Sequence, residues 1–209
     1  SELLRKQMEA EMYAMGYVAT GTIIAGEIQA AHPHAYGTGP LPAHAPIVLD
    51  VFPVSMQSHY WADCTRTLFK GEPSAAFKKM YEAVRAAQRL GIEKVRAGAD
   101  GAVIHRAVRD YFERSGYPTA IHEKGAHGFI HGLGHGVGIE LHEAPHVNTR
   151  SETLRPGNIV TIEPGLYYPK TQQGIPAGGI RLEDMVLVTK AGCRNLTRLP
   201  SDIRWAVMS

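Results

Sequence analysis

Five acidic or imidazole side chains are the residues of this sequence best suited to chemistry. Such groups seldom occur inside strand-like apolar runs unless they have a partner. Left alone, a buried carboxylate would raise its pKa and lose its charge, whereas a divalent cation keeps it ionised. A metal site is therefore predicted from Asp50 in IVLDVF, Asp63 in YWADCTRT, His135 in GLGHGVG, Glu163 in VTIEPG and Glu183 in IRLEDMVLV.

The charge of this set favours two metal ions over one. Four carboxylates and one imidazole carry more negative charge than a single divalent ion balances. Two ions bridged by carboxylates would balance it, and such a pair can hold an attacking water and a substrate oxygen. An oxygen-rich shell with one imidazole suits Mn²⁺, Co²⁺ or Zn²⁺. For any one acid alone, an ion pair at a strand edge is the alternative.

A segment rich in glycine and histidine, FIHGLGHGVGIELHEAP at 129–145, surrounds His135 and also carries His131 and His142. Four glycines stand at alternate positions between Gly132 and Gly138. Ordering a glycine costs conformational entropy, so this pattern indicates a backbone that passes close to something or bends sharply.

Two helices are predicted between the acidic segments. The first begins at the N-cap Ser74 and is interrupted at Gly91 and Gly98, and the second begins after Asp100 and ends at Gly116. Together they predict a helical hairpin. Its apolar positions recur at helical spacing: Phe77, Met80, Tyr81, Val84, Ala87, Ile104, Ala107, Val108, Tyr111 and Phe112.

The start of the chain resembles the second helix of this hairpin. MGYV at 15–18 mirrors SGYP at 115–118, and strand-like runs follow both: PIVLDVF, then NIVTIEPGLYY and IRLEDMVLVT. We infer a weak duplication into α+β halves, about 1–73 and 74–209, on either side of a cleft. The first half has no counterpart of the helix that begins at Ser74, so a natural N-terminal segment is expected to be missing. Alternatively, the first half evolved without that helix. The apolar stripe of the first helix is Leu4, Met8, Met12 and Met15.

Composition excludes several classes of function. The chain has 209 residues, enough for one domain, and a formal net charge of +2, so neither a nucleic-acid-binding stripe nor an acidic tail is indicated. No stretch approaches the roughly 20 apolar residues that a membrane span needs. Only two cysteines, Cys64 and Cys193, are present, and we expect both to be reduced thiols in a cytoplasmic protein.

Four segments resemble the metal-binding motifs of the pita-bread metallopeptidases, the family of methionine aminopeptidase, aminopeptidase P and prolidase. The segments are VLDVFPVSMQSHYWADCTRT, GLGHGVGIELHEAP, VTIEPGLYYP and GGIRLEDMVLVT. The resemblance implies an α+β pita-bread fold with two pseudo-symmetric halves and a dinuclear metal centre. Its ligands would be Asp50 and Asp63 from the first half and His135, Glu163 and Glu183 from the second.

The same resemblance implies roles for other histidines. His142 matches a histidine that hydrogen-bonds the substrate near the scissile carbonyl and stabilises the tetrahedral intermediate. His131 matches one that lies on the leaving-group side in the Xaa-Pro branch. His34 in AAHPHAYGTGPL matches a further substrate ligand, for which His32 is a competitor. We expect ordinary polar roles for His44, His59, His105, His122, His127 and His146.

Arg181 selects a branch within the family. RLED resembles the form found in prolidase and aminopeptidase P, and with His131 it favours cleavage of Xaa-Pro bonds. A salt bridge from Arg181 to a ligand carboxylate is also expected, and Thr65 could orient a ligand by a hydrogen bond. Glu163 would accept a proton from water and pass it to the leaving proline nitrogen.

We therefore predict a dinuclear metallopeptidase that acts on Xaa-Pro dipeptides, a prolidase. Aminopeptidase P is the close alternative, followed by methionine aminopeptidase and by metal-free relatives that hydrolyse creatine or bind peptides. The expected partners are small peptides with proline second, and a homodimer is expected from the family.

Two features depart from the family. The spacing from Asp50 to Asp63 is longer than usual, and His59 stands where glycine is common, so the connecting turn is expected to differ. The loop at 164–179 is expected to shape substrate access.

Overall fold

The computed structural model describes residues 1–123, 125–197 and 199–208. Its helices are α1 (Glu2–Ala14), α2 (Ala75–Lys94), α3 (Gly101–Arg114), the short α4 (Ile203–Ala206) and the 3-10 helix η1 (Glu27–Ala31). Its strands are β1 (Tyr17–Val18), β2 (Ile23–Gly26), β3 (Pro46–Val51), β4 (Val54–Ser55), β5 (Cys64–Lys70), β6 (Ala120–His122), β7 (Gly125–His127), β8 (Gly134–Gly136), β9 (Glu143–Val147), β10 (Ile159–Ile162), β11 (Gly165–Tyr168), β12 (Gly178–Arg181), β13 (Asp184–Val188), β14 (Cys193–Asn195) and β15 (Val207–Met208).

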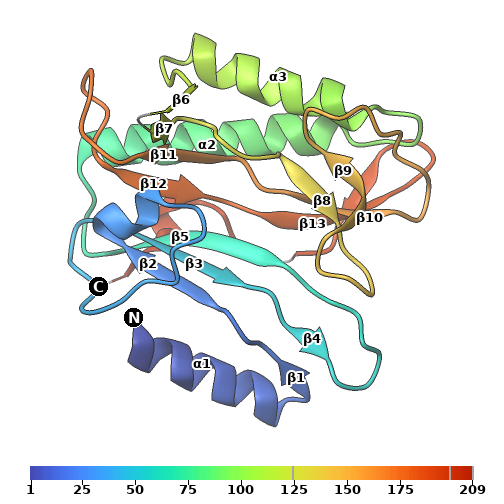
Figure 1. The fold of residues 1–209 in the computed structure, drawn as a ribbon, viewed down its shortest axis with the longest axis horizontal. Helices are drawn as coiled ribbons and strands as arrows, with labels where there is room; N and C mark the ends of the chain where they lie inside the picture. Colours follow the sequence, from blue (N-terminus) through green and yellow to red (C-terminus); the bar gives the residue numbers. More distant parts are fainter. Residues whose placement is uncertain (124, 198, 209) are drawn as a thin grey trace.

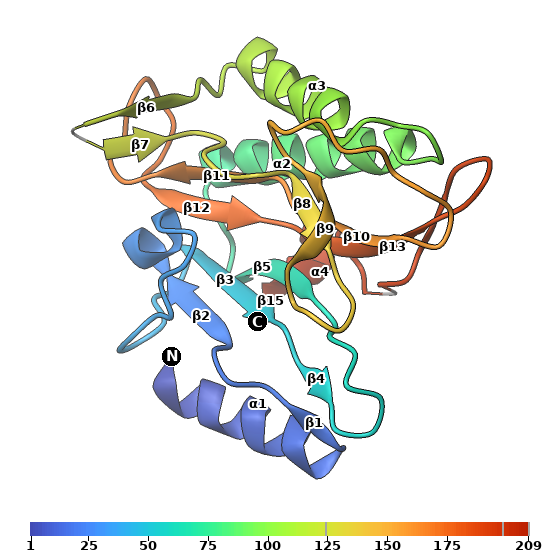
Figure 2. The same cartoon turned by 45° about the vertical axis from the view of Figure 1, so that its right-hand side comes forward.

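Two sheets carry the acidic segments. One has five strands in the order β14-β13-β10-β8-β9, and the other has four in the order β15-β5-β3-β2. Figures 1 and 2 show α2 and α3 side by side on one side of these sheets and α1 on the opposite side. The sheets meet where the Glu183 amide donates a hydrogen bond to the Thr65 carbonyl at 3.0 Å. This junction brings the two sets of acids together.

The predicted helical hairpin is confirmed, with one correction. The Ser74 side chain caps α2 by accepting a hydrogen bond from the Phe77 amide, and the Asp100 side chain caps α3. The predicted interruption at Gly91 is wrong, because α2 continues through Gly91 to Lys94. A Cβ at this position would lie 2.9 Å from the Ile162 side chain, so the glycine allows close helix–sheet packing.

Helices α1 and α3 end in the same way. Met15 and Ser115 have nearly equal backbone angles, and the glycines that follow are left-handed, with φ of 87° at Gly16 and 83° at Gly116. The helices differ in packing, because α3 buries an apolar face whereas no described residue of α1 is buried. Strand β15 belongs to the second predicted half, yet it pairs with β5 of the first half, so the two halves share this sheet. The duplication stays a prediction.

The two cysteines are free thiols, as predicted. Burial is the main reason why the pKa of Cys64 rises to about 11, which keeps this thiol protonated at neutral pH. Among the described residues, no helix combines the length and apolar character needed to cross a bilayer.

The unusual turn between Asp50 and Asp63 contains a left-handed residue. His59 is exposed and has a φ of 59°, a conformation that costs a non-glycine residue roughly 1–2 kcal/mol. His59→Gly is therefore expected to raise the free energy of unfolding by about 1 kcal/mol in a denaturant titration, after the greater flexibility of the unfolded glycine chain is counted. Gln57→Gly is the control in the same turn, where no positive φ is relieved. A loss of stability in His59→Gly as large as in Gln57→Gly would contradict the strain.

Candidate metal centre

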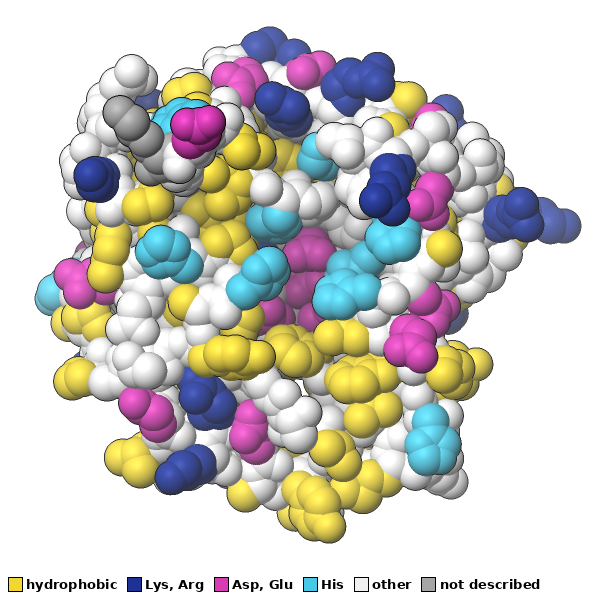
Figure 3. Space-filling view, viewed as in Figure 1, with side chains coloured by type: hydrophobic (Ala, Val, Ile, Leu, Met, Phe, Trp, Pro, Cys, Tyr) yellow, Lys and Arg dark blue, Asp and Glu magenta, His cyan; other side chains and the backbone are white. Residues whose placement is uncertain are grey.

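Every residue predicted for the site lines one cavity of about 420 Å³. Figure 3 shows acidic side chains in a hollow on this face, with histidines around it. The five predicted metal ligands come from distinct strands or strand ends. Asp50 lies in β3, Asp63 directly before β5, His135 in β8, Glu163 directly after β10, and Glu183 between β12 and β13.

Three of these ligands already present their donor atoms together. Atoms of Asp63, His135 and Glu183 lie within 4.8 Å of one another. Nε2 of His135 is 3.6 Å from an Asp63 oxygen and 3.3 Å from a Glu163 oxygen. The other ring nitrogen, Nδ1, donates to the Gly136 carbonyl, which turns Nε2 toward the acids. This is the usual way of orienting a metal-binding imidazole.

The electrostatics of the cluster fit a divalent cation. Burial raises the pKa of Asp63 and of Glu183 well above the usual range, and the neighbouring carboxylates raise both pKa values further. One oxygen of Asp50 is buried and accepts no hydrogen bond from the described residues. Cations would compensate the crowded charges and satisfy this oxygen, so the donor set fits the predicted metals.

Glu163 is the exception to the raised pKa values. Burial opposes its ionised form, but the hydrogen bond from His135 and the electrostatic interactions with His131, His135 and Arg181 outweigh burial and lower its pKa. Thr161 adds a hydrogen bond to the same carboxylate at 3.2 Å. Glu163 therefore stays ionised at neutral pH, as a proton acceptor must.

Arg181 forms the expected salt bridge to a ligand carboxylate. Its guanidinium donates to Asp50 at 2.6 Å, and it also donates to the hydroxyl of Thr65, the carbonyl of Pro33 and the hydroxyl of Tyr167. Thr65 in turn donates to Glu183 at 2.7 Å, which confirms the expected hydrogen bond to a predicted ligand. With only 3% of its surface exposed, Arg181 fixes Asp50 and the Pro33 segment relative to each other.

His131 belongs to the same network through Tyr167. Nδ1 of His131 donates to the Gly132 carbonyl, so Nε2 accepts from the Tyr167 hydroxyl at 2.9 Å. Burial is the main reason why the pKa of His131 is lowered, and the ring is neutral at neutral pH. Tyr167 lies in β11, within the loop expected to shape access, yet none of residues 164–179 lines the cavity. That segment supports the site through Tyr167 instead.

The structure shows which of the other candidate histidines line the cavity. His34 lines the cavity and His32 does not, so the structure favours His34 as the histidine near the predicted metal site. His142 also lines the cavity, with its ring centre 4.1 Å from that of His135. Burial and the His135 charge lower the pKa of His142, which leaves a neutral ring that can donate a hydrogen bond.

His146 is a cavity residue for which an ordinary polar role was expected. It lies in β9 and lines the cavity, and its Nδ1 contacts Glu152 at 3.1 Å. The Glu152 carboxylate also accepts from the His146 amide at 2.9 Å. The only sequence signal was its place four residues after His142, because nothing local shows that the chain turns back toward the cavity.

The structure gives a local reason for the alternating glycines. A Cβ at Gly134 would lie 1.9 Å from the Thr161 carbonyl oxygen in β10, and one at Gly136 would lie 2.6 Å from the Glu143 carbonyl oxygen in β9. The predicted close approach is seen toward the flanking strands, and Gly132 and Gly134 also line the cavity. It allows β8 to carry His135 between β9 and β10.

Comparison with known proteins identifies the family. A model described as "Metallopeptidase family M24" matches residues 1–190. The chain belongs to metallopeptidase family M24. The predicted family resemblance is confirmed, and so is the α+β pita-bread fold, which the solved M24 relatives share.

The M24 relatives include two kinds of Xaa-Pro peptidase. The Xaa-Pro dipeptidase of Pyrococcus furiosus is 34% identical over 187 residues, which cover 88% of this chain and 49% of that protein. The structure of an Xaa-Pro dipeptidase from Bacillus anthracis matches 97% of this chain and 53% of its own, with 32% identity and a TM-score of 0.83. An X-Pro aminopeptidase from Thermotoga maritima matches 96% of this chain and 53% of its own, with 30% identity and a TM-score of 0.83. The chain spans about half the length of the relatives it matches.

Proposed function

We propose that this M24 chain hydrolyses the peptide bond between an N-terminal residue and proline, with Xaa-Pro dipeptides as substrates. The observation that carries the proposal is the convergence of the five predicted metal ligands on one cavity. The names of the M24 relatives support the Xaa-Pro bond as the target. An X-Pro aminopeptidase among the structural relatives supports the second candidate, an aminopeptidase of the same bond.

Asp50, Asp63, His135, Glu163 and Glu183 would hold two divalent cations, with Mn²⁺ expected first and Co²⁺ or Zn²⁺ as alternatives. When bound, the cations would supply Lewis-acid activation of water and of the scissile carbonyl. Arg181 would orient Asp50 by its hydrogen bond at 2.6 Å, and Thr65 would orient Glu183 by its hydrogen bond at 2.7 Å. These contacts hold the ligand geometry before substrate arrives.

Glu163 would take the proton from the attacking water and deliver it to the leaving proline nitrogen. His142, neutral and free of hydrogen bonds to the described chain, would donate to the oxygen of the scissile carbonyl as negative charge develops there. His34 and His131 would line the substrate path, with His131 held by Gly132 and Tyr167. A homodimer stays a prediction.

The direct test measures hydrolysis of Ala-Pro, Ala-Ala and Ala-Pro-Ala. The 209-residue chain is first freed of metal and then given Mn²⁺, Co²⁺ or Zn²⁺. We expect metal-dependent cleavage of Ala-Pro and little cleavage of Ala-Ala. Asp63→Asn is the matched inactive variant, because it removes one ligand charge with almost no change in shape. Preference for Ala-Pro-Ala would select the aminopeptidase, and equal rates for Ala-Pro and Ala-Ala would reject proline specificity.

A further inference from the structure

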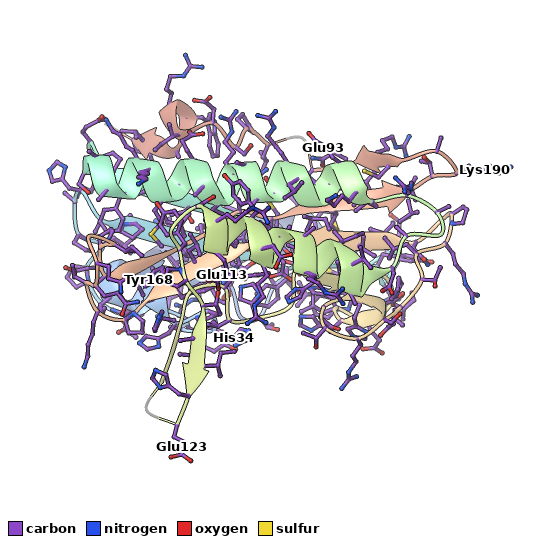
Figure 4. All side chains as sticks on the ribbon, turned by 90° about the horizontal axis from the view of Figure 1, so that it is seen from above. His34, Glu93, Glu113, Glu123, Tyr168 and Lys190 are labelled. Atoms are coloured by element: carbon purple, nitrogen blue, oxygen red, sulfur yellow. The ribbon has the colours of Figure 1, made fainter. Side chains whose placement is uncertain are left out.

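A second cavity, of about 500 Å³, adjoins the metal cavity. The two share four lining residues: His131, Gly132, His146 and Asn148. Helix α3 forms one side of the second cavity, the segment after β9 forms another, and Ile121 of the β6–β7 hairpin adds a third. Figure 2 shows this hairpin beside α3. In Figure 4 the hairpin, with Glu123 near its tip, projects toward the same side as His34.

The two cavities have opposite charge. Four carboxylates line the metal cavity, whereas the second cavity is lined by Arg109 and Arg150 and by no Asp or Glu. Both arginines are exposed, and neither forms a salt bridge within residues 1–123, 125–197 and 199–208. The nearby Glu152 is already held by His146. The guanidinium groups are therefore available to an anion.

A buried polar group in the second cavity also lacks a partner. His105 lines this cavity with 6% of its surface exposed. Its Nδ1 atom has no hydrogen-bond partner among the described residues. Its ring packs against Phe129 with centres 5.1 Å apart. Because burial is the main cause of lowering its pKa to about 4, the ring is neutral at neutral pH. The cavity thus combines an apolar wall, one unsatisfied imidazole and two cations, as small-ligand sites often do.

We propose that the second cavity binds the C-terminal residues and free carboxylate of a peptide longer than a dipeptide. This inference rests on the proposed cleavage of Xaa-Pro bonds. A peptide has its amine at one end and its carboxylate at the other, so the acidic cavity and the arginine cavity fix its direction. Arginine pairs with carboxylates through two parallel hydrogen bonds, which suits Arg109 and Arg150 to this end. Longer Xaa-Pro peptides with a free carboxylate would then bind in one direction across the two cavities.

Kinetics on paired substrates test the cavity directly. Ala-Pro-Ala-Ala with a free carboxylate is expected to have a kcat/KM about tenfold above that of its C-terminal amide. Arg109→Gln/Arg150→Gln should remove this difference and leave Ala-Pro cleavage unchanged. Arg106→Gln, on the same helix but outside the cavity, is the matched control. Equal kcat/KM values for acid and amide in the natural chain, or an equal loss in Arg106→Gln, would overturn the proposal.

Binding separates this inference from the proposed activity. Titration calorimetry of the product-like peptide Pro-Ala-Ala should give a Kd about tenfold lower than that of its amide, and the double arginine variant should lose the difference. A charge-dependent Kd without hydrolysis of any Xaa-Pro substrate would reject the proposed function and retain the cavity as a carboxylate site. Hydrolysis of Ala-Pro with equal Kd values for Pro-Ala-Ala and its amide would reject the carboxylate site and retain the proposed function.

Discussion

Glu163→Gln is expected to lower the turnover of Ala-Pro by roughly 10²- to 10⁴-fold, the range for loss of a general acid–base group. The amide keeps the size of the carboxylate but cannot accept the proton from water. The environment of Glu163 is arranged for the ionised form, because His135 and Thr161 both lie at hydrogen-bond distance from its carboxylate. The measurement is kcat at saturating metal, with bound metal counted in the same samples.

Glu140→Gln is the control for this experiment. Glu140 is an exposed carboxylate on the same glycine-rich segment and does not line the metal cavity. Its replacement should leave kcat within a factor of about two, since it touches neither ligand nor substrate. Near-normal turnover in Glu163→Gln with metal still bound would contradict the assigned proton transfer.

Arg66→Met is expected to cause the largest loss of stability, about 3–5 kcal/mol in the free energy of unfolding. Arg66 is 2% exposed and forms a salt bridge to Asp184 at 2.6 Å. It also donates to the carbonyls of Thr65, Glu183, Leu199 and Pro200. Its removal would leave a buried carboxylate unpaired and four carbonyls without this donor.

Two further variants serve as controls for Arg66→Met. Arg204→Met removes a salt bridge from a side chain that is 90% exposed, and water already screens that pair, so stability should hardly change. Arg66→Met/Asp184→Asn removes the orphaned charge and should recover part of the loss. Denaturant titration measures all three variants. A loss in Arg66→Met no greater than in Arg204→Met would contradict the structural role of the buried pair.

The acidic residues that gather at the metal cavity could be predicted from breaks in the local pattern. Asp50 and Glu183 interrupt apolar runs, and a charge in a strand that enters the core requires a partner. The helices were predictable for a similar reason, since Ser74 and Asp100 mark the starts of periodic segments. Gly91 misled because its small size serves packing against Ile162, and helix propensity alone does not record such a contact.

The supporting residues were less accessible to sequence reasoning. Arg66 and Tyr167 look ordinary in the sequence, and their roles depend on partners more than ten residues away. His146 belongs with them, because its place between the two cavities arises only when β9 returns beside β8. Long-range placement, and not residue type, decides these roles.

The metal centre is tested most directly by counting the metal ions that bind to the metal-free chain during titration with Mn²⁺, Co²⁺ or Zn²⁺. Thermal unfolding is followed in parallel. We expect binding of roughly two ions per chain and a rise in Tm, because cations that bind only the folded state stabilise it. Asp63→Asn should weaken both effects. Absence of bound metal in the natural chain, with an unchanged Tm, would contradict the metal centre.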